Sequence, residues 1–170
     1  MQVLNKNSVS LAGEFAVLSQ LTLRGYDANL TLGHTKGVDI LASDPNTGNM
    51  FKVEVKTSFE NKPSQSKLFG YTLSWVMSEK NETIIDPKLF YCFVNIEKQT
   101  NIFKFFIVPS KVVAEYVAKQ HQYWINSKEN ISKEAETTLI RNFRIGLNED
   151  KSQILTPQAK DFENNWNFQL

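Results

Sequence analysis

Apolar and charged residues alternate without a break in FKVEVK, residues 51–56. Successive side chains of a strand point to opposite faces, so this run predicts a half-buried β-strand. Its apolar face carries Phe51, Val53 and Val55, and its charged face carries Lys52, Glu54 and Lys56. The pattern alone leaves open whether Glu54 and Lys56 are solvated charges or half of an active site.

The residues near the start of the chain predict a helix. Ser8 or Ser10 can cap it, and it runs to about Arg24, where Gly25 is placed to end it. On a helical wheel one side collects the apolar residues Leu11, Phe15, Val17, Leu18 and Leu21, whereas Ala12, Ala16, Ser19 and Gln20 fall elsewhere.

Glu14 lies inside that apolar cluster of the predicted helix. A buried carboxylate is costly unless it finds a partner or loses its charge. Two interpretations remain open. Glu14 either bonds a nearby group or sits at the rim near the helix start, where the helix dipole favours it, or it belongs to a functional site.

A hairpin is predicted after this helix. Residues 26–32 predict a strand with Ala28, Leu30 and Leu32 on one face, and residues 37–43 predict a second strand. The Pro, Asn and Gly of residues 44–49 predict a turn that returns the chain into the strand of residues 50–58. The order is therefore helix, strand, strand, strand.

The rest of the chain continues to interleave strands and helices. The polar residues 59–70 predict a loop that is mobile or closes over a site. The later predicted elements are a strand running into a short helix (71–83), two buried strands (89–96 and 102–109), a helix with Ser110 as its cap (110–125), a late strand (138–145) and a terminal helix (157–168). This order predicts a single domain over residues 1–170, of α/β or α+β class, around one mixed sheet.

Composition narrows the function classes only a little. No apolar run is long enough to span a bilayer, and no signal peptide begins the chain, so we expect a soluble cytoplasmic protein with no membrane partner. One cysteine and two histidines offer no zinc-site spacing. The net charge of +1 argues against nucleic-acid binding through bulk positive charge, but it leaves room for a local basic groove.

Asp39 and Glu54 form the first candidate site. If the turn centres between Asn46 and Thr47, Asp39 lies directly opposite Glu54, with Cβ atoms roughly 5 Å apart. Two carboxylates at about 5 Å repel by on the order of 3 kcal/mol at an effective dielectric constant near 20. A divalent cation would remove that repulsion, and hard carboxylate oxygens suit Mg²⁺. A bulge or a one-residue shift would instead place Asp39 on the other face.

Lys56 shares the face of Glu54, one step further along the strand. An ammonium group there can help to deprotonate a metal-bound water or stabilise charge on a phosphate. The alternative is a plain ion pair with Glu54 or Asp39, a role that Lys52 can also fill.

These residues together resemble the PD-(D/E)XK nuclease superfamily, which includes restriction endonucleases and Holliday-junction resolvases. The resemblance covers roughly residues 8–58 and is carried by Glu14, by GVDI (37–40) and by EVKTS (54–58). The longer run from GEFAVL to VEVKTS also resembles a group of small uncharacterised bacterial proteins assigned to this superfamily. Val38 replaces the signature Pro, and nothing beyond Ser58 matches the superfamily pattern.

The resemblance implies a restriction-endonuclease-like core, with a mixed central sheet flanked by helices. It implies that Asp39, Glu54 and the backbone carbonyl of Val55 bind Mg²⁺ or Mn²⁺, that Lys56 assists the attacking water, and that Glu14 reaches the site, often through water. We therefore expect a metal-dependent nuclease that hydrolyses DNA phosphodiester bonds, with a homodimer as a further possibility.

Further expectations concern contacts with nucleic acid and alternative functions. Residues placed to contact nucleic acid are Lys36, Lys52, Thr57 and Ser58. Alternative functions are a catalytically inactive, nuclease-like binding or accessory subunit in DNA repair or defence, or an immunity- or toxin-related protein. The sequence leaves open whether the substrate is DNA or RNA, and whether the enzyme is an endonuclease or an exonuclease.

Overall fold

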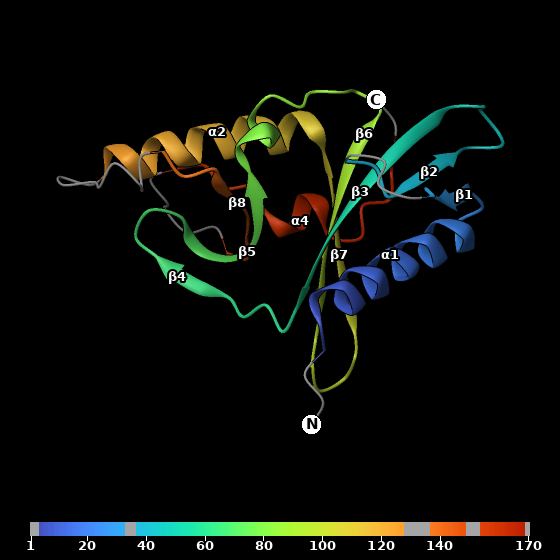
Figure 1. The fold of residues 1–170 in the computed structure, drawn as a ribbon, viewed down its shortest axis with the longest axis horizontal. Coiled ribbons are helices and arrows are strands. Elements are labelled where there is room, and N and C mark those ends of the chain that lie inside the picture. The colour runs from blue at the N-terminus through green and yellow to red at the C-terminus, as the bar shows by residue number, and fades with distance from the viewer. Residues whose placement is uncertain (1–3, 33–36, 128–136, 149–153, 169–170) are drawn as a thin grey trace. The chain divides into compact units, whose positions relative to one another are not determined.

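The computed structural model describes residues 4–32, 37–127, 137–148 and 154–168 (Figure 1). The chain folds into two compact units. Unit 1 comprises Met1–Asn61, Asp86–Pro109 and Phe162–Leu170, and unit 2 comprises Lys62–Ile85 and Ser110–Asp161. The single domain expected from the sequence stays a prediction.

Unit 1 is built on a mixed five-stranded sheet. In spatial order its strands are β1 (Asp27–Leu30), β2 (Ile40–Ser43), β3 (Met50–Phe59), β6 (Leu89–Ile96) and β7 (Phe103–Pro109). The central pair β3–β6 is parallel, and the other pairs are antiparallel. The predicted α+β class with a mixed central sheet is confirmed.

The β2–β3 hairpin has the register that the sequence predicts. Ile40 lies opposite Val53, and the last pair before the turn is Ser43 with Met50. The turn closes through a hydrogen bond from the Gly48 N–H to the Asp44 carbonyl at 2.7 Å, and Gly48 adopts a positive φ of 72°. A glycine takes this conformation at little cost, so the turn fixes the pairing.

Helix α1 (Lys6–Leu23) ends where the sequence predicts and begins earlier. Gly25, just past its end, has a φ of +84°, the left-handed conformation typical of a helix C-terminus. The predicted cap at Ser8 or Ser10 is wrong. Asn5 caps the helix instead, and its side-chain oxygen accepts a hydrogen bond from the Ser8 N–H at 2.7 Å.

The predicted apolar face of α1 is wrong in part. Val17 and Leu21 are buried as expected, but Leu11 and Phe15 are 48% and 54% exposed. The helix instead turns its small residues toward the sheet. Gly13 is buried, and Ala12 and Ala16 pack partly buried against the core. Small side chains let a helix approach a sheet closely, and a wheel that weighs residues by hydrophobicity misses this.

The core of unit 1 lies between α1 and the sheet. Val17, Leu21, Phe51, Val53 and Val55 all belong to one buried cluster, so the predicted apolar face of β3 is confirmed. All eight residues of β6 are buried. On β1, Ala28 and Leu30 pack against this core, but Leu32 is 98% exposed, contrary to the sequence prediction, because β1 ends at Leu30.

The only cysteine of the chain, Cys92, lies at the middle of β6. It is fully buried, and this burial raises the pKa of its thiol far above the ordinary value. The helices within the described ranges are all too short or too polar to cross a bilayer.

Unit 2 contains a three-stranded antiparallel sheet in the order β4 (Ser64–Ser66), β5 (Gly70–Ser78), β8 (Ile140–Gly146). Its other elements in the described ranges are the short 3₁₀ helix η1 (Glu79–Glu82), the helix α2 (Ser110–Asn126) and, at its boundary, α4 (Ala159–Phe162). The predicted loop 59–70 is wrong in part, because Ser64–Ser66 form β4 within it, and the predicted terminal helix is shortened to α4. The predicted strand and short helix over 71–83, and the helix from Ser110, are confirmed.

Candidate functional site

Asp39 lies at a bend immediately before β2 and is tied to both neighbours of Glu54. Its backbone N–H donates to the Val53 carbonyl at 2.9 Å, and its Oδ2 accepts a hydrogen bond from the Val55 N–H at 2.7 Å. Continuing the register of the hairpin by one residue beyond Ile40 places Asp39 across from Glu54. Asp39 and Glu54 are therefore brought together at the end of the β2–β3 pair.

Glu54 is the buried carboxylate of this site. Its side chain is only 6% exposed, although it stands on the face of β3 opposite to Val53 and Val55. One oxygen, Oε1, pairs with the Lys56 ammonium at 2.5 Å. The other, Oε2, is buried and has no hydrogen-bond partner among the residues that the structure describes. A buried charged oxygen without a partner costs free energy, so this atom is suited to a cation.

Gly37 forms the wall beside that unpaired oxygen. A Cβ atom built on Gly37 would lie 3.4 Å from Glu54 Oε2, and Gly37 has a φ of +74°. A larger residue here would be strained by its backbone conformation, and its Cβ would lie in van der Waals contact with the carboxylate. Because Gly37 has no side chain, the space beside Glu54 Oε2 is not filled from this side.

Asp39 carries the clearest electrostatic signal of the site. Burial raises the pKa of its carboxyl group, and the nearby carboxylates of Glu14 and Glu54 raise it further. The Val55 N–H and the Lys56 ammonium act in the opposite direction but do not compensate. Negative charge is thus in excess here, which is the situation that a bound cation relieves.

Glu14 reaches the same neighbourhood from α1. It is half-buried, and the Ser10 hydroxyl, one turn earlier in the helix, donates to its Oε1 at 3.1 Å. Its negative charge contributes to the raised pKa of Asp39. The structure therefore brings Glu14, Asp39, Glu54 and Lys56 to one part of unit 1.

The donor set fits a hard divalent cation through few ligands. No three His, Cys, Asp or Glu side chains gather closely enough to hold a metal within the described ranges. Asp39 and Glu54 are the two carboxylates that the hairpin register places opposite each other, and the backbone carbonyl of Val55 stays a predicted third ligand. Oxygen donors of this kind suit Mg²⁺ or Mn²⁺.

The residues expected to contact nucleic acid are scattered. Lys52 forms an ion pair with Asp86 at 2.9 Å rather than with Glu54 or Asp39. Thr57 turns its hydroxyl into the contact with α1, where it is buried, and Ser58 is half-buried on β3, which continues to Phe59. Lys36 lies outside the described residues.

Sequence reasoning missed a second charged cluster, in unit 2. Arg141 is buried on β8 and pairs with Glu79 and Glu82 of η1. His121 of α2 lies close enough for Arg141 to lower its pKa, although burial is the larger cause. The alternation of RNFRI in a strand predicts that Arg141, Phe143 and Ile145 share a face, and this was the available signal. Two carboxylates thus share the single guanidinium of Arg141 in two ion pairs.

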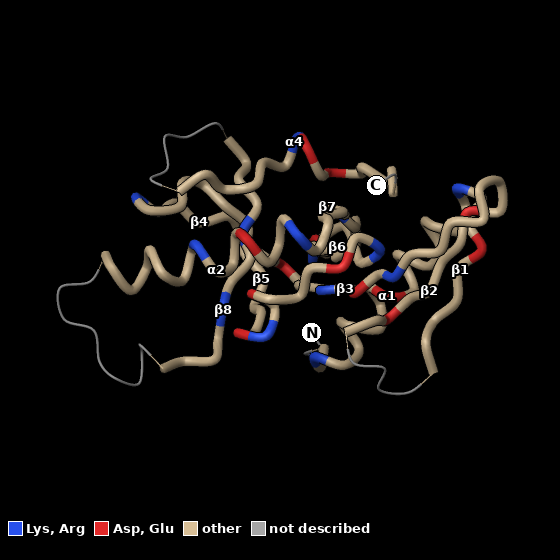
Figure 2. The backbone as a smooth tube through the Cα atoms, turned by 90° about the horizontal axis from the view of Figure 1, so that it is seen from above, with Lys and Arg blue, Asp and Glu red and all other residues tan. Residues whose placement is uncertain are grey.

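Positive and negative positions are mixed along the described part of the chain. Lys and Arg positions are interspersed with Asp and Glu positions along the tube in Figure 2, in agreement with the net charge of +1. Any attraction for a polyanion must therefore come from a few local contacts.

Comparison with known proteins identifies the fold. No protein-family model matches the chain, and no curated protein is similar to it at a significant level. Among solved structures, the bacterial homing endonuclease I-Ssp6803I is similar, with a TM-score of 0.51 and 13% sequence identity over 96% of this chain and 90% of that chain. At this identity the likeness concerns the fold, so the chain has a nuclease-like fold.

Proposed function

We propose that the protein is a nuclease of the PD-(D/E)XK type that hydrolyses DNA phosphodiester bonds with Mg²⁺ or Mn²⁺. One observation carries the proposal: Glu54 keeps a buried, unpaired carboxylate oxygen next to Asp39, whose pKa is raised. The nuclease-like fold supports it, because the chain is similar to a homing endonuclease over nearly its whole length.

Each residue has a distinct role in this proposal. Asp39, Glu54 and the Val55 carbonyl would hold the cation, which supplies positive charge to the phosphate and acidifies a bound water when present. Lys56 holds a proton at its Nζ beside Glu54 and would orient or assist the water. Glu14, itself bonded by Ser10, would accept a hydrogen bond from water at the edge of the site.

The proposed test is cleavage of plasmid, short duplex and single-stranded DNA, and of RNA, with Mg²⁺, with Mn²⁺ and with EDTA. We expect cleavage with metal alone, lowered about 100-fold or more by Asp39→Ala, Glu54→Gln or Lys56→Met, since each removes a group at the reacting atoms. Asp27→Asn is the matched control, because Asp27 is an exposed carboxylate on β1 outside the site. Equal rates in Asp39→Ala and wild type would overturn the proposal.

A second candidate is a nuclease-like binding subunit without catalysis, in DNA repair or defence. It is favoured by the direct Lys56–Glu54 ion pair, which occupies one carboxylate oxygen, and by the small number of ligating side chains within the described part of the chain. Thermal melting with Mn²⁺ separates the two. A melting temperature that Mn²⁺ raises in wild type but not in Glu54→Gln, without cleavage of any substrate, would support the binding subunit.

The homodimer and the cytoplasmic location expected from the sequence stay predictions. The mass of the protein in solution, with and without DNA, tests the first.

A further inference from the structure

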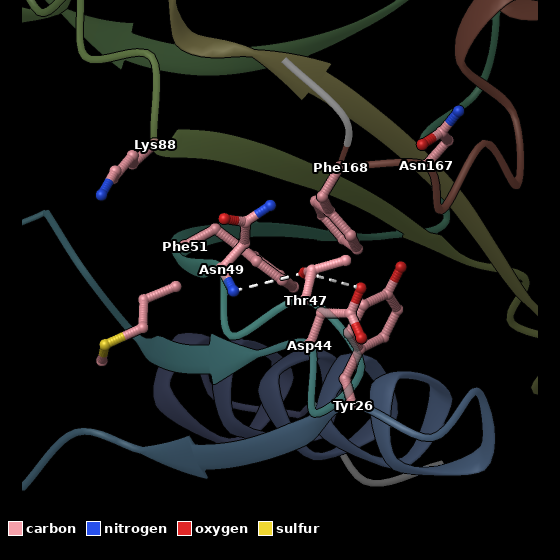
Figure 3. A pocket seen from close by; sticks show the side chains of 9 residues that line it. Tyr26, Asp44, Thr47, Asn49, Phe51, Lys88, Asn167 and Phe168 are labelled. Atoms are coloured by element: carbon pink, nitrogen blue, oxygen red, sulfur yellow. Dashed lines mark hydrogen bonds between the residues drawn. The ribbon is translucent and has the colours of Figure 1, made fainter.

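A pocket opens in unit 1 at the turn of the β2–β3 hairpin, and neither Asp39 nor Glu54 lines it. Its volume is about 390 Å³, and we call it the hairpin-turn pocket. It is lined by aromatic rings, two carboxamides and one ammonium group: Tyr26, Phe51, Phe168, Asn49, Asn167 and Lys88 (Figure 3). None of these residues belongs to the candidate metal site.

Three aromatic rings form one continuous wall of the hairpin-turn pocket. Phe168 stacks on Phe51 with ring centroids 4.1 Å apart, and Tyr26 meets both rings edge-on. Phe51 is almost fully buried, whereas Phe168 remains partly exposed, so Phe168 presents the ring surface that a ligand can reach. A partly exposed ring held by Phe51, Tyr26 and Phe90 is preorganised for a flat, apolar ligand.

The polar groups of the pocket are arranged around this wall. In Figure 3, Lys88 and Asn167 lie on opposite sides of Phe168, and Asn49 lies near the turn below it. Lys88 is exposed, and its positive charge helps to lower the pKa of Asp86, whose direct ion pair is with Lys52. A carboxamide offers both a donor and an acceptor, which matches the edge of a nucleobase, and an exposed ammonium group suits a phosphate.

Asp44 adds one negative group to the pocket and limits how a ligand can lie. The Asn46 N–H and the Thr47 hydroxyl lower its pKa, so it stays ionised, and both bonds hold it in the turn. A phosphate would be repelled by this carboxylate, whereas an exocyclic amino group would be attracted. The phosphate of a ligand therefore belongs beside Lys88, and its base belongs beside Phe168.

We propose that the hairpin-turn pocket binds one unpaired nucleotide, with its base on Phe168 and its phosphate beside Lys88. The inference rests on the proposed nuclease function for its choice of substrate and makes that substrate more specific. Phe51 precedes Glu54 by three residues on β3, which spans about 10 Å. An odd number of residues also puts the two side chains on opposite faces of β3, so the pocket is separate from the proposed metal site.

The test measures binding in EDTA, where no cleavage can occur. The probe is a short fluorescein-labelled oligodeoxyadenylate, followed by fluorescence anisotropy at low salt, with a duplex of the same length for comparison. We expect the single strand to bind more tightly than the duplex, because a paired base cannot reach Phe168. We expect Lys88→Gln and Asn49→Ala each to weaken binding about tenfold.

The controls separate this pocket from bulk charge and from catalysis. Lys6→Gln removes the same charge from an exposed position on α1, outside the pocket, and should leave affinity unchanged. Unlabelled dAMP that displaces the probe would identify a free nucleotide as the ligand, and failure to displace it would identify a nucleotide within a strand. Wild-type affinity in both pocket variants, or no binding of either probe, would overturn the inference. Binding is measured without metal, so its outcome does not depend on cleavage. A protein without nuclease activity can still bind the nucleotide in this pocket, and an active nuclease can lack this binding.

Discussion

Gly13 of α1 and Thr57 of β3 approach so closely that a Cβ atom on the glycine would lie 1.8 Å from the Thr57 Oγ1. This contact sets the depth at which α1 packs on the sheet. Glu14 follows Gly13 directly, and Lys56 precedes Thr57 directly, so the same contact brings both charged residues to one level of unit 1. The position of Glu14 in the candidate site therefore depends on the absence of a side chain at its neighbour.

Gly13→Ala should accordingly lower both stability and activity. The added methyl group overlaps the hydroxyl, and α1 must shift, at a cost of about 1–3 kcal/mol in the free energy of unfolding. Urea denaturation measures this cost. The double variant Gly13→Ala/Thr57→Ala removes the closest atom but keeps Thr57 Cβ, 2.9 Å away, so it should recover part of the loss. Strictly additive effects would contradict the close approach.

Asp39 should make the folded state less stable as pH rises, which is the reverse of the usual effect of a carboxyl group. Its pKa is raised above the ordinary value of 3.8, so the folded state holds this proton more tightly than the unfolded chain does. The contribution of Asp39 to stability is fully present below the ordinary pKa and is lost as pH rises through the raised pKa. Without metal, Asp39→Asn should therefore melt at a higher temperature than wild type at neutral pH and equally in acid.

Asp44→Asn is the matched control for this pH dependence, with the opposite sign. The pKa of Asp44 is lowered by its bonds to Asn46 and Thr47, so its contribution is present above the ordinary pKa and is lost as pH falls through the lowered one. Asp44→Asn should melt below wild type at neutral pH. If both substitutions shift melting in the same direction, the assigned causes are wrong.

Lys56→Met should lower the free energy of unfolding, because it leaves the buried Glu54 carboxylate without its ion-pair partner. Without Lys56, both oxygens of Glu54 lack a partner among the described residues, and the free energy of unfolding should fall by about 2–3 kcal/mol, less than for a wholly buried pair. A cation bound at Glu54 would replace the lost charge. Mn²⁺ should therefore restore more stability to Lys56→Met than it adds to wild type, as read from melting curves.

The double variant Glu54→Gln/Lys56→Met supplies the comparison for that experiment. It removes both charges together, so it should be more stable without metal than Lys56→Met alone, and Mn²⁺ should leave its melting temperature unchanged. Equal responses to Mn²⁺ in wild type and in both variants would place the metal elsewhere.

Lys52→Gln should behave differently from Lys56→Met, although the two lysines share a face of β3. Lys52 pairs with Asp86 at the surface, and both side chains are more than a third exposed. Such a pair contributes at most about 1 kcal/mol. Because Asp86 already neutralises Lys52, we expect the salt dependence of DNA binding to stay unchanged. A lower dependence on salt in Lys52→Gln would instead show a phosphate contact.

The hairpin and the strand that carries Glu54 were predictable because local rules decide them. Alternation placed Phe51 and Val53 in the core, and the turn residues fixed a register in which Asp39 meets Glu54. The candidate site follows from this register, so its four charged residues could be selected from the sequence. Their catalytic roles stay predictions.

The missed features depend on contacts between distant parts of the chain. Leu11 and Phe15 are exposed because Gly13 packs against Thr57, 44 residues away, and no local pattern reports that contact. The strand β4 pairs with β5 although its own residues are polar, so periodicity gives no sign of it. The aromatic wall at Phe168 likewise joins segments that are remote in sequence.

The burial of Cys92 makes the protein its own reporter of unfolding. The single thiol is inaccessible in the central strand, and its raised pKa keeps it protonated. Electrophilic reagents that label thiolates therefore cannot react with Cys92 in the folded chain. The rate of its labelling should therefore follow global opening of unit 1, as mass spectrometry can measure. The labelling rate of Cys92 could therefore rank every variant above by stability, without a fluorescent probe or an engineered residue.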